Sequence, residues 1–343
     1  MIGAIVIAEA ENRENGPQET PGSSSLSGRN QLVECLAGVE LLGMSVLARL
    51  IQNLTGTKTI AGVSVVVDGR LPDFDLTHDP DVVIHATSDV WGVAREQLLD
   101  QRHRGLDSVL IIRTGAYIEC DLDDLVRFHH RSGEAVTGVG DDQGALDFWV
   151  VNSHIASGDD DLRTRLEGAE ACYRIQGYVN RLDSWWEMRR LVIDGLTLRC
   201  LFWPQGREVR PGVWMAEGAQ LKRGARIVAP GFIGRDVTIS DQCLITRCTN
   251  VENGSYVDYG TVVEDSSILA GTYIGIGLDL SHSIAHGTHL AHLDHDVVLE
   301  ITDPMVVRPM RGTHSRRARI SPSWPTGRHR KWRVGNRKPS GNS

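Results

Sequence analysis

The second half of the chain carries a strict six-residue repeat. Between residues 215 and 269 an aliphatic side chain recurs at every sixth position, and the residue four places later is small except at Val237 and Tyr273. The repeated positions are Met215, Leu221, Ile227, Ile233, Ile239, Ile245, Val251, Val257, Val263 and Leu269. Three hexads form one coil of a triangular parallel β-solenoid, in which each side buries one aliphatic residue and each corner needs a small one. The repeat therefore predicts a little over three coils.

The end of this solenoid must be covered. The hexad pattern breaks over residues 275–303, and residues 297–301 are predicted to form a closing strand. Five histidines lie between: His282, His286, His289, His292 and His295. They could ligate a metal or supply the base of an acyltransferase. Because no second cluster of Asp, Glu or Cys completes a ligand set, a polar capping turn is the favoured interpretation.

The first half of the chain alternates predicted strands and helices. We expect strands at 3–8, 63–67, 108–112 and 135–139, a long polar loop at 9–30, and helices that follow Ser45, span 89–103 and follow Asp121. This alternation indicates an α/β layer with a mostly parallel sheet. In such sheets ligands lie beyond the carboxyl ends of the strands, here near Ala8 and Thr114.

Composition and charge exclude several classes of protein. The apolar run at 3–8 is far too short to span a bilayer, and six scattered cysteines without a C-x-x-C motif favour a reducing, cytoplasmic location. The net charge is −8, but residues 308–343 hold eleven Lys or Arg and no Asp or Glu. Such a tail could be an arm for nucleic acid, although the acidic remainder of the chain favours a solvated, disordered tail instead.

Four local motifs occur in order along the first 214 residues. Residues 42–47 are similar to a "GKPLL" helix entry, 109–129 to the strand, loop and helix around "NGD", 177–185 to "GYW-x-D-I", and 211–214 to a joint into a β-helix. With the α/β layer and the hexads, the chain resembles the sugar-1-phosphate nucleotidyltransferases, especially the mannose-1-phosphate guanylyltransferase-like branch. The resemblance implies a nucleotidyltransferase-like domain at 1–210, a left-handed parallel β-helix with its cap at 211–303, and a basic tail at 304–343.

The resemblance also implies a chemistry whose usual groups are missing here. In this family a sugar phosphate attacks a nucleoside triphosphate, with a glycine-rich G-x-G-T-R loop for the phosphates and carboxylates for Mg²⁺. Residues 8–13 instead read Ala-Glu-Ala-Glu-Asn-Arg, and the family's "PK" lysine falls near Asn30 and Gln31. The "NGD" aspartate falls on Ala116, and the second metal aspartate falls on Arg181 or Asn180.

The residues that could still contact a ligand flank the predicted cleft. They are Ala8, Glu9, Arg13, Thr114 and Gly115, with Asn152 as a further candidate. Glu119 and Asp121 are weak candidates for a metal, since Asp121 is better explained as a helix cap. We therefore expect no catalytic residue, and Mg²⁺ only if the protein is active.

Three hypotheses follow for the function. The first is a non-catalytic regulatory or scaffold subunit of nucleotide-sugar metabolism, which could bind a nucleotide or nucleotide sugar and form a homo- or hetero-oligomer, with an active paralogue as one candidate partner. The second is an active sugar nucleotidyltransferase with a rearranged site. The third is a hexapeptide acyltransferase that acts through a histidine such as His282 or His286. The missing groups favour the first.

Overall fold

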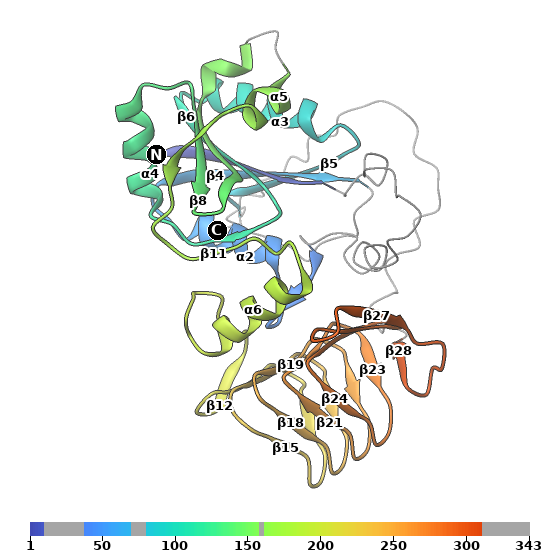
Figure 1. Ribbon diagram of the computed structural model, residues 1–343. Helices are drawn as coiled ribbons and strands as arrows, with labels where there is room; N and C mark the ends of the chain where they lie inside the picture. The colour runs from blue at the N-terminus through green and yellow to red at the C-terminus, as the bar shows by residue number, and fades with distance from the viewer. Residues whose placement is uncertain (10–37, 70–79, 158–160, 311–343) are drawn as a thin grey trace, which may run out of the picture. The chain divides into compact units, whose positions relative to one another are not determined.

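The computed structural model describes residues 1–9, 38–69, 80–157 and 161–310 (Figure 1). The chain is a mixed α/β protein with several sheets, most of whose strand pairs are parallel. Residues 1–310 form one compact unit. The predicted 9–30 loop beyond Glu9 and the predicted tail beyond residue 310 lie outside the described residues.

The first half contains a seven-stranded sheet with β1 near its centre. Its order is β10-β8-β9-β6-β1-β4-β5. The bounds are β1 (Ile2–Ala8), β4 (Ile60–Asp68), β5 (Val82–Thr87), β6 (Ser108–Arg113), β8 (Val136–Asp141), β9 (Gly144–Asn152) and β10 (Ala171–Arg174). Only β9 runs antiparallel to its neighbours β6 and β8. Every residue of β1 is buried because helices cover both faces of the sheet.

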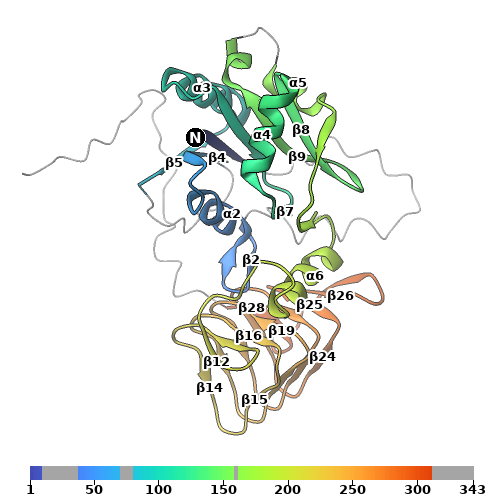
Figure 2. The same cartoon turned by 90° about the vertical axis from the view of Figure 1, so that its left-hand side faces the viewer.

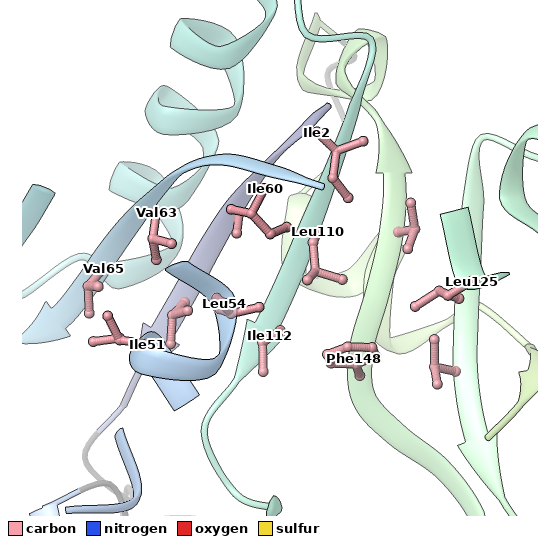
Figure 3. Close-up of a cluster of buried hydrophobic side chains, with 14 of the residues drawn as sticks. Ile2, Ile51, Leu54, Ile60, Val63, Val65, Leu110, Ile112, Leu125 and Phe148 are labelled. Atoms are coloured by element: carbon pink, nitrogen blue, oxygen red, sulfur yellow. The ribbon is translucent and has the colours of Figure 1, made fainter. Parts of the chain in front are cut away.

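Each face of the sheet has its own apolar core. Helices α2 (Val46–Thr55) and α4 (Leu122–Ser132) cover one face, and α3 (Val90–His103), α5 (Leu162–Glu167) and the 3-10 helix η3 (Ser153–Ser157) cover the other. Figure 3 shows the first core, in which Ile112 and Phe148 of the sheet lie between Leu54 of α2 and Leu125 of α4. Side chains of β1 alternate between the two cores, as the two-residue period of a strand requires.

The predicted elements of the first half are confirmed. The Ser45 hydroxyl accepts a hydrogen bond from the Ala48 amide at the start of α2, and Asp121 caps α4 through the Asp124 amide. Strands β5, β9 and β10 of this sheet were not predicted. Strand β5 lies at the sheet edge with Val83 and Ile84 exposed, so it lacks the buried apolar run that marks the inner strands.

Residues 207–310 form three sheets whose strands are stacked coil upon coil (Figures 1 and 2). The first sheet contains β12 (Arg207–Arg210), β13 (Val213–Met215), β16 (Gly231–Ile233), β19 (Thr249–Val251), β22 (Ser267–Ile268), β25 (Ser283–His286), β26 (His289–His292) and β27 (Val297–Glu300). The second contains β14 (Gln220–Leu221), β17 (Thr238–Ile239), β20 (Tyr256–Val257), β23 (Thr272–Ile274) and β28 (Val307–Pro309). The third contains β15 (Arg226–Ile227), β18 (Leu244–Thr246), β21 (Val262–Glu264) and β24 (Asp279–Ser281). We call residues 213–286 the coil, and one circuit through its three sheets a turn of the coil.

The predicted inward positions are confirmed from Ile227 to Val263, and Met215 is half-buried against the same core, but Leu221 and Leu269 are wrong. Leu221 is 38% exposed, because it belongs to the first turn of the coil. Val251 pairs with Ile268, only 17 residues on, whereas in the earlier turns of the coil the paired residues are 18 apart. Ile268 therefore lies in the core of the coil and Leu269 belongs to a different cluster.

The turn that is one residue shorter also changes where the repeat ends. Ile274, Leu280 and Ala285 continue the inward series, so the coil extends past residue 275, where the strict hexads stop. The small corner residue is Thr272 and not Tyr273, which removes one of the two apparent exceptions. A search for a strict period of six misses the inward residues that follow a turn with one residue fewer.

Buried hydroxyl groups connect neighbouring turns of the coil at their corners. Ser255 and Thr261 each donate to a carbonyl 14 residues on, at 3.0 and 2.5 Å, whereas the Thr249 hydroxyl donates to the Thr246 carbonyl at 2.6 Å. Each also accepts the amide 17 residues on, at 3.3, 3.2 and 3.2 Å. The corners bury backbone groups that no strand pairs, so these hydroxyls supply the partners that burial demands.

Antiparallel strands close the far end of the coil. Strand β26 pairs antiparallel with β25, and β27 pairs antiparallel with β26, which confirms the predicted closing strand at 297–301. Strand β28 pairs antiparallel with β23. Residues 307–309 therefore belong to the fold, although the sequence pattern placed them in the tail segment.

Candidate functional site

Glu9 lies directly after β1, where the glycine-rich phosphate loop was expected. Its carboxylate accepts a hydrogen bond from Nε1 of Trp91 at 2.9 Å. It also lies 3.8 Å from a guanidinium nitrogen of Arg113, the last residue of β6, and 3.6 Å from one of Arg163 in α5. The first residue beyond the central strand is therefore fixed by one aromatic and two cationic side chains.

Two further carboxylates complete this cluster, which we call the Glu9 network. Arg113 forms an ion pair with Asp147 at 2.6 Å and another with Glu167 at 3.2 Å, and Glu167 also accepts from Nε of Arg163 at 2.9 Å. Three carboxylates thus surround two guanidinium groups. Both arginines are already paired and the sum of charges is negative, so the Glu9 network offers a triphosphate neither guanidinium group as a free partner.

Ala8, Thr114 and Gly115 lie beside the Glu9 network, whereas Asn152 pairs with Ser108 at the opposite end of β6. Ala8 is buried in the core of the α2 and α4 face. The Thr114 amide donates to the Ile7 carbonyl at 2.8 Å, and Gly115 has open space where a side chain would stand. Asn152 is half-buried and its Oδ1 accepts from the ring of His129 at 3.1 Å, so it serves the packing of α4 on the sheet. Arg13, Glu11, Asn30 and Gln31 lie outside the described residues.

The two positions of the family's metal aspartates contain groups that serve the fold. Ala116 packs against the apolar core. Arg181 forms an ion pair with Asp141 and donates to the Gly144 carbonyl at 3.0 Å. Asn180 is fully buried and donates to the Glu187 carbonyl at 2.8 Å. Neither position presents a carboxylate.

The substitute metal candidates are engaged elsewhere as well. Glu119 accepts from the Tyr117 hydroxyl at 2.8 Å and from the Leu201 amide at 2.5 Å. Asp121 caps α4 through the Asp124 amide at 3.0 Å. Within residues 1–9, 38–69, 80–157 and 161–310, no three His, Cys, Asp or Glu side chains are grouped closely enough to hold a metal ion.

The five histidines lie on and beside β25 and β26, where His286 and His289 are register partners. Nδ1 of His282 lies 3.0 Å from Asp265, His292 and His295 have ring centroids 4.6 Å apart, and His286 is exposed on β25. The histidines therefore do not form a single capping turn facing water, because three of them lie on strands and only His286 and His295 are exposed.

Sequence patterns gave no indication of a sizeable cavity in the described part of the chain. It has a volume of about 530 Å³ and lies between α2 and α4 over β6 and β9. Leu50 of α2 is only half-buried because it faces this cavity. Glu119 and Asp121 line the cavity, whereas Ala8, Glu9, Thr114 and Gly115 do not.

A buried polar joint connects the α/β layer to the coil. The hairpin of β2 (Glu40–Leu41) and β3 (Met44–Ser45) donates the amides of Leu42 and Gly43 to the Glu252 carboxylate, at 2.7 and 2.8 Å. Glu252 is fully buried and also accepts from the Asn250 side chain at 2.6 Å. Burial raises the pKa of Glu252 to about 8, because desolvation of the carboxylate outweighs these three donors.

An apolar cluster surrounds this joint. It contains Leu41 and Leu42 of the hairpin, Met188 and Leu191 of α6 (Trp185–Leu196), and Phe232 of the coil, among other residues on both sides. The outer surface of the first sheet of the coil is therefore an internal surface of the protein.

Comparison with known proteins identifies no relative of this chain. No protein-family model matches the sequence, and the search of curated proteins finds no match. Among the described residues, no helix has both the length and the apolar character needed to cross a membrane.

Proposed function

We propose that the protein is a non-catalytic member of the sugar-1-phosphate nucleotidyltransferase family, acting as a regulatory or scaffold subunit, and that its coil is the left-handed β-helix of that family. The observation that carries the proposal is the Glu9 network. It fills the position of the phosphate loop with carboxylates whose arginine partners are already paired.

The second support comes from the metal positions. The leaving pyrophosphate of a nucleotidyl transfer must be neutralised, usually by Mg²⁺ on carboxylates. Here those positions are Ala116, which packs in the core, and Arg181, which is held by Asp141. A cation introduced at the second position would meet a guanidinium group, so any nucleotide sugar that binds is expected to bind without Mg²⁺.

The test is isothermal titration with GTP, dTTP, UTP, GDP-mannose and UDP-glucose, each with and without Mg²⁺. Metal-independent binding of a nucleotide sugar supports a regulatory subunit that senses this ligand. Magnesium-dependent binding of a triphosphate, or release of pyrophosphate on addition of a sugar phosphate, contradicts the proposal and favours an active enzyme.

A pair of variants connects any binding to the predicted cleft. Arg163→Ala removes an arginine of the Glu9 network, whereas Arg165→Ala removes a neighbouring arginine of α5 that no contact ties to that network. If the ligand binds at this edge of the sheet, only Arg163→Ala should change its affinity. Equal effects of the two variants would place the ligand elsewhere.

A further inference from the structure

We propose that the cavity between α2 and α4 binds a small, largely apolar molecule whose single polar end is neutral or cationic. This site lies apart from the Glu9 network and shares no lining residue with it. The proposal is independent of the nucleotidyltransferase hypothesis.

The size and the floor of the cavity indicate an apolar body. A volume of about 530 Å³ lies in the range of small-molecule sites in proteins. Ile112, Phe148 and Leu54 form the floor, and the half-buried Leu50 forms part of the wall. Figure 3 shows Leu54, Ile112 and Phe148 projecting toward one another from α2, β6 and β9. A water-filled space over such a floor favours an apolar occupant, because binding removes that surface from water.

The charged residues at the rim determine which polar end fits. Three carboxylates, Glu119, Asp121 and Asp123, and one ammonium group, Lys58, line the cavity, which gives a net charge of −2. Each carboxylate uses only one or two of its acceptor positions in the fold, so each can accept a further donor. An amine or hydroxyl end can donate to these oxygens, whereas an anionic end would be repelled.

A chain-length series with matched ends tests both parts of the proposal. The probes are hexyl, octyl and decyl compounds that end in a primary amine, an alcohol or a carboxylate, titrated into the full-length protein below their micelle concentrations. We expect affinity to rise about fourfold for each methylene until the cavity is filled. At equal length the carboxylate should bind most weakly.

Cys120 lines the cavity, and burial raises the pKa of its thiol to about 12, so its alkylation is slow and must be followed over hours to report occupancy. Alkylation by a maleimide, followed by peptide mass spectrometry, should be slowed at Cys120 by the decyl amine but unchanged at the exposed Cys172. Leu50→Phe fills part of the cavity and should lower affinity at least tenfold, whereas Leu299→Phe, at an exposed position on β27, should not.

Two results would overturn the proposal. Affinity that does not depend on chain length, or equal protection of Cys120 and Cys172, would show that the probes adhere without entering the cavity. A carboxylate that binds more tightly than the amine of the same length would overturn the assignment of the polar end. Both results can be read on the wild-type protein, whatever the stability of Leu50→Phe.

Discussion

Nη2 of Arg189 in α6 lies 2.8 Å from Oδ1 of Asp265 in the coil, and the arginine side chain is almost fully buried. The same nitrogen donates to the Cys248 carbonyl at 2.8 Å, and Nη1 donates to Ser267 at 3.2 Å. A helix of the first half is therefore anchored in the coil by a guanidinium group with several acceptors.

Removing this guanidinium should strongly destabilise the protein. Arg189→Ala leaves buried acceptors and part of the Asp265 charge without a partner, and we expect a loss of about 3–5 kcal/mol in the free energy of unfolding by denaturant titration. The adjacent Arg190 forms an exposed ion pair with Glu187, so Arg190→Ala should cost no more than about 1 kcal/mol. Equal losses would show that Arg189 does not anchor α6.

The buried carboxylate of the joint predicts a pH-dependent stability. Because the pKa of Glu252 is raised to about 8 from an ordinary value of 4.5, the folded state holds a proton that the unfolded chain releases. The free energy of unfolding should therefore decrease as pH rises from 4.5 to 8, by at most about 1.4 kcal/mol per pH unit from this group.

Glu252→Gln isolates this contribution. The glutamine cannot titrate, so the difference in unfolding free energy between wild type and variant should change across pH 5–8, with the wild type losing more. Asn250 and the hairpin amides remain in place in both proteins. A difference that stays constant with pH would mean that Glu252 is ionised throughout this range.

The corner hydroxyls predict a measurable cost for an isosteric change. Thr261 is fully buried, donates to the Gly275 carbonyl and accepts the Leu278 amide. Thr261→Val keeps the shape but leaves both backbone groups without partners, which should cost about 1–3 kcal/mol in thermal or chemical unfolding. Thr238 is only half-buried and lies on an outward position of β17, so Thr238→Val should be nearly neutral.

The inward position of Ile268, the first inward residue after the shift to a 17-residue spacing, can be tested. Ile268→Ala should cost about 2–5 kcal/mol, since Ile268 is fully buried in the core of the coil. Ile276 is 58% exposed, and Ile276→Ala should change stability by less than about 0.5 kcal/mol. If Ile268→Ala were as mild as Ile276→Ala, the inward assignment of Ile268 would be wrong.

The sequence predicted the features that depend on local periodicity and capping. The inward series from Ile227 to Val263, the cap at Asp121 and the inner strands all follow from patterns within a few residues. The missed features depend on residues far apart in the chain. The shift to Ile268 is invisible to a fixed period, and β5 becomes a strand only by pairing with β4.

The candidate site shows the same division. The order of the motifs was enough to align the metal positions with Ala116 and Arg181, neither of which is a carboxylate. The partners of Glu9 could not be predicted in this way. Trp91, Arg113 and Arg163 come from three different elements, and no spacing in the sequence relates them. The cavity escaped prediction for the same reason, since its floor combines α2, β6 and β9.

The contact between Leu42 and Glu252 spans 210 residues and therefore has a consequence for synthesis on the ribosome. A nascent chain that has emerged only as far as residue 210 contains the hairpin and α6, but not the surface that buries Leu41, Leu42 and Met188. Translation at roughly 5–20 residues per second leaves these side chains uncovered for several seconds until residue 252 appears. During that interval the emerging chain is the form of this protein most in need of a chaperone.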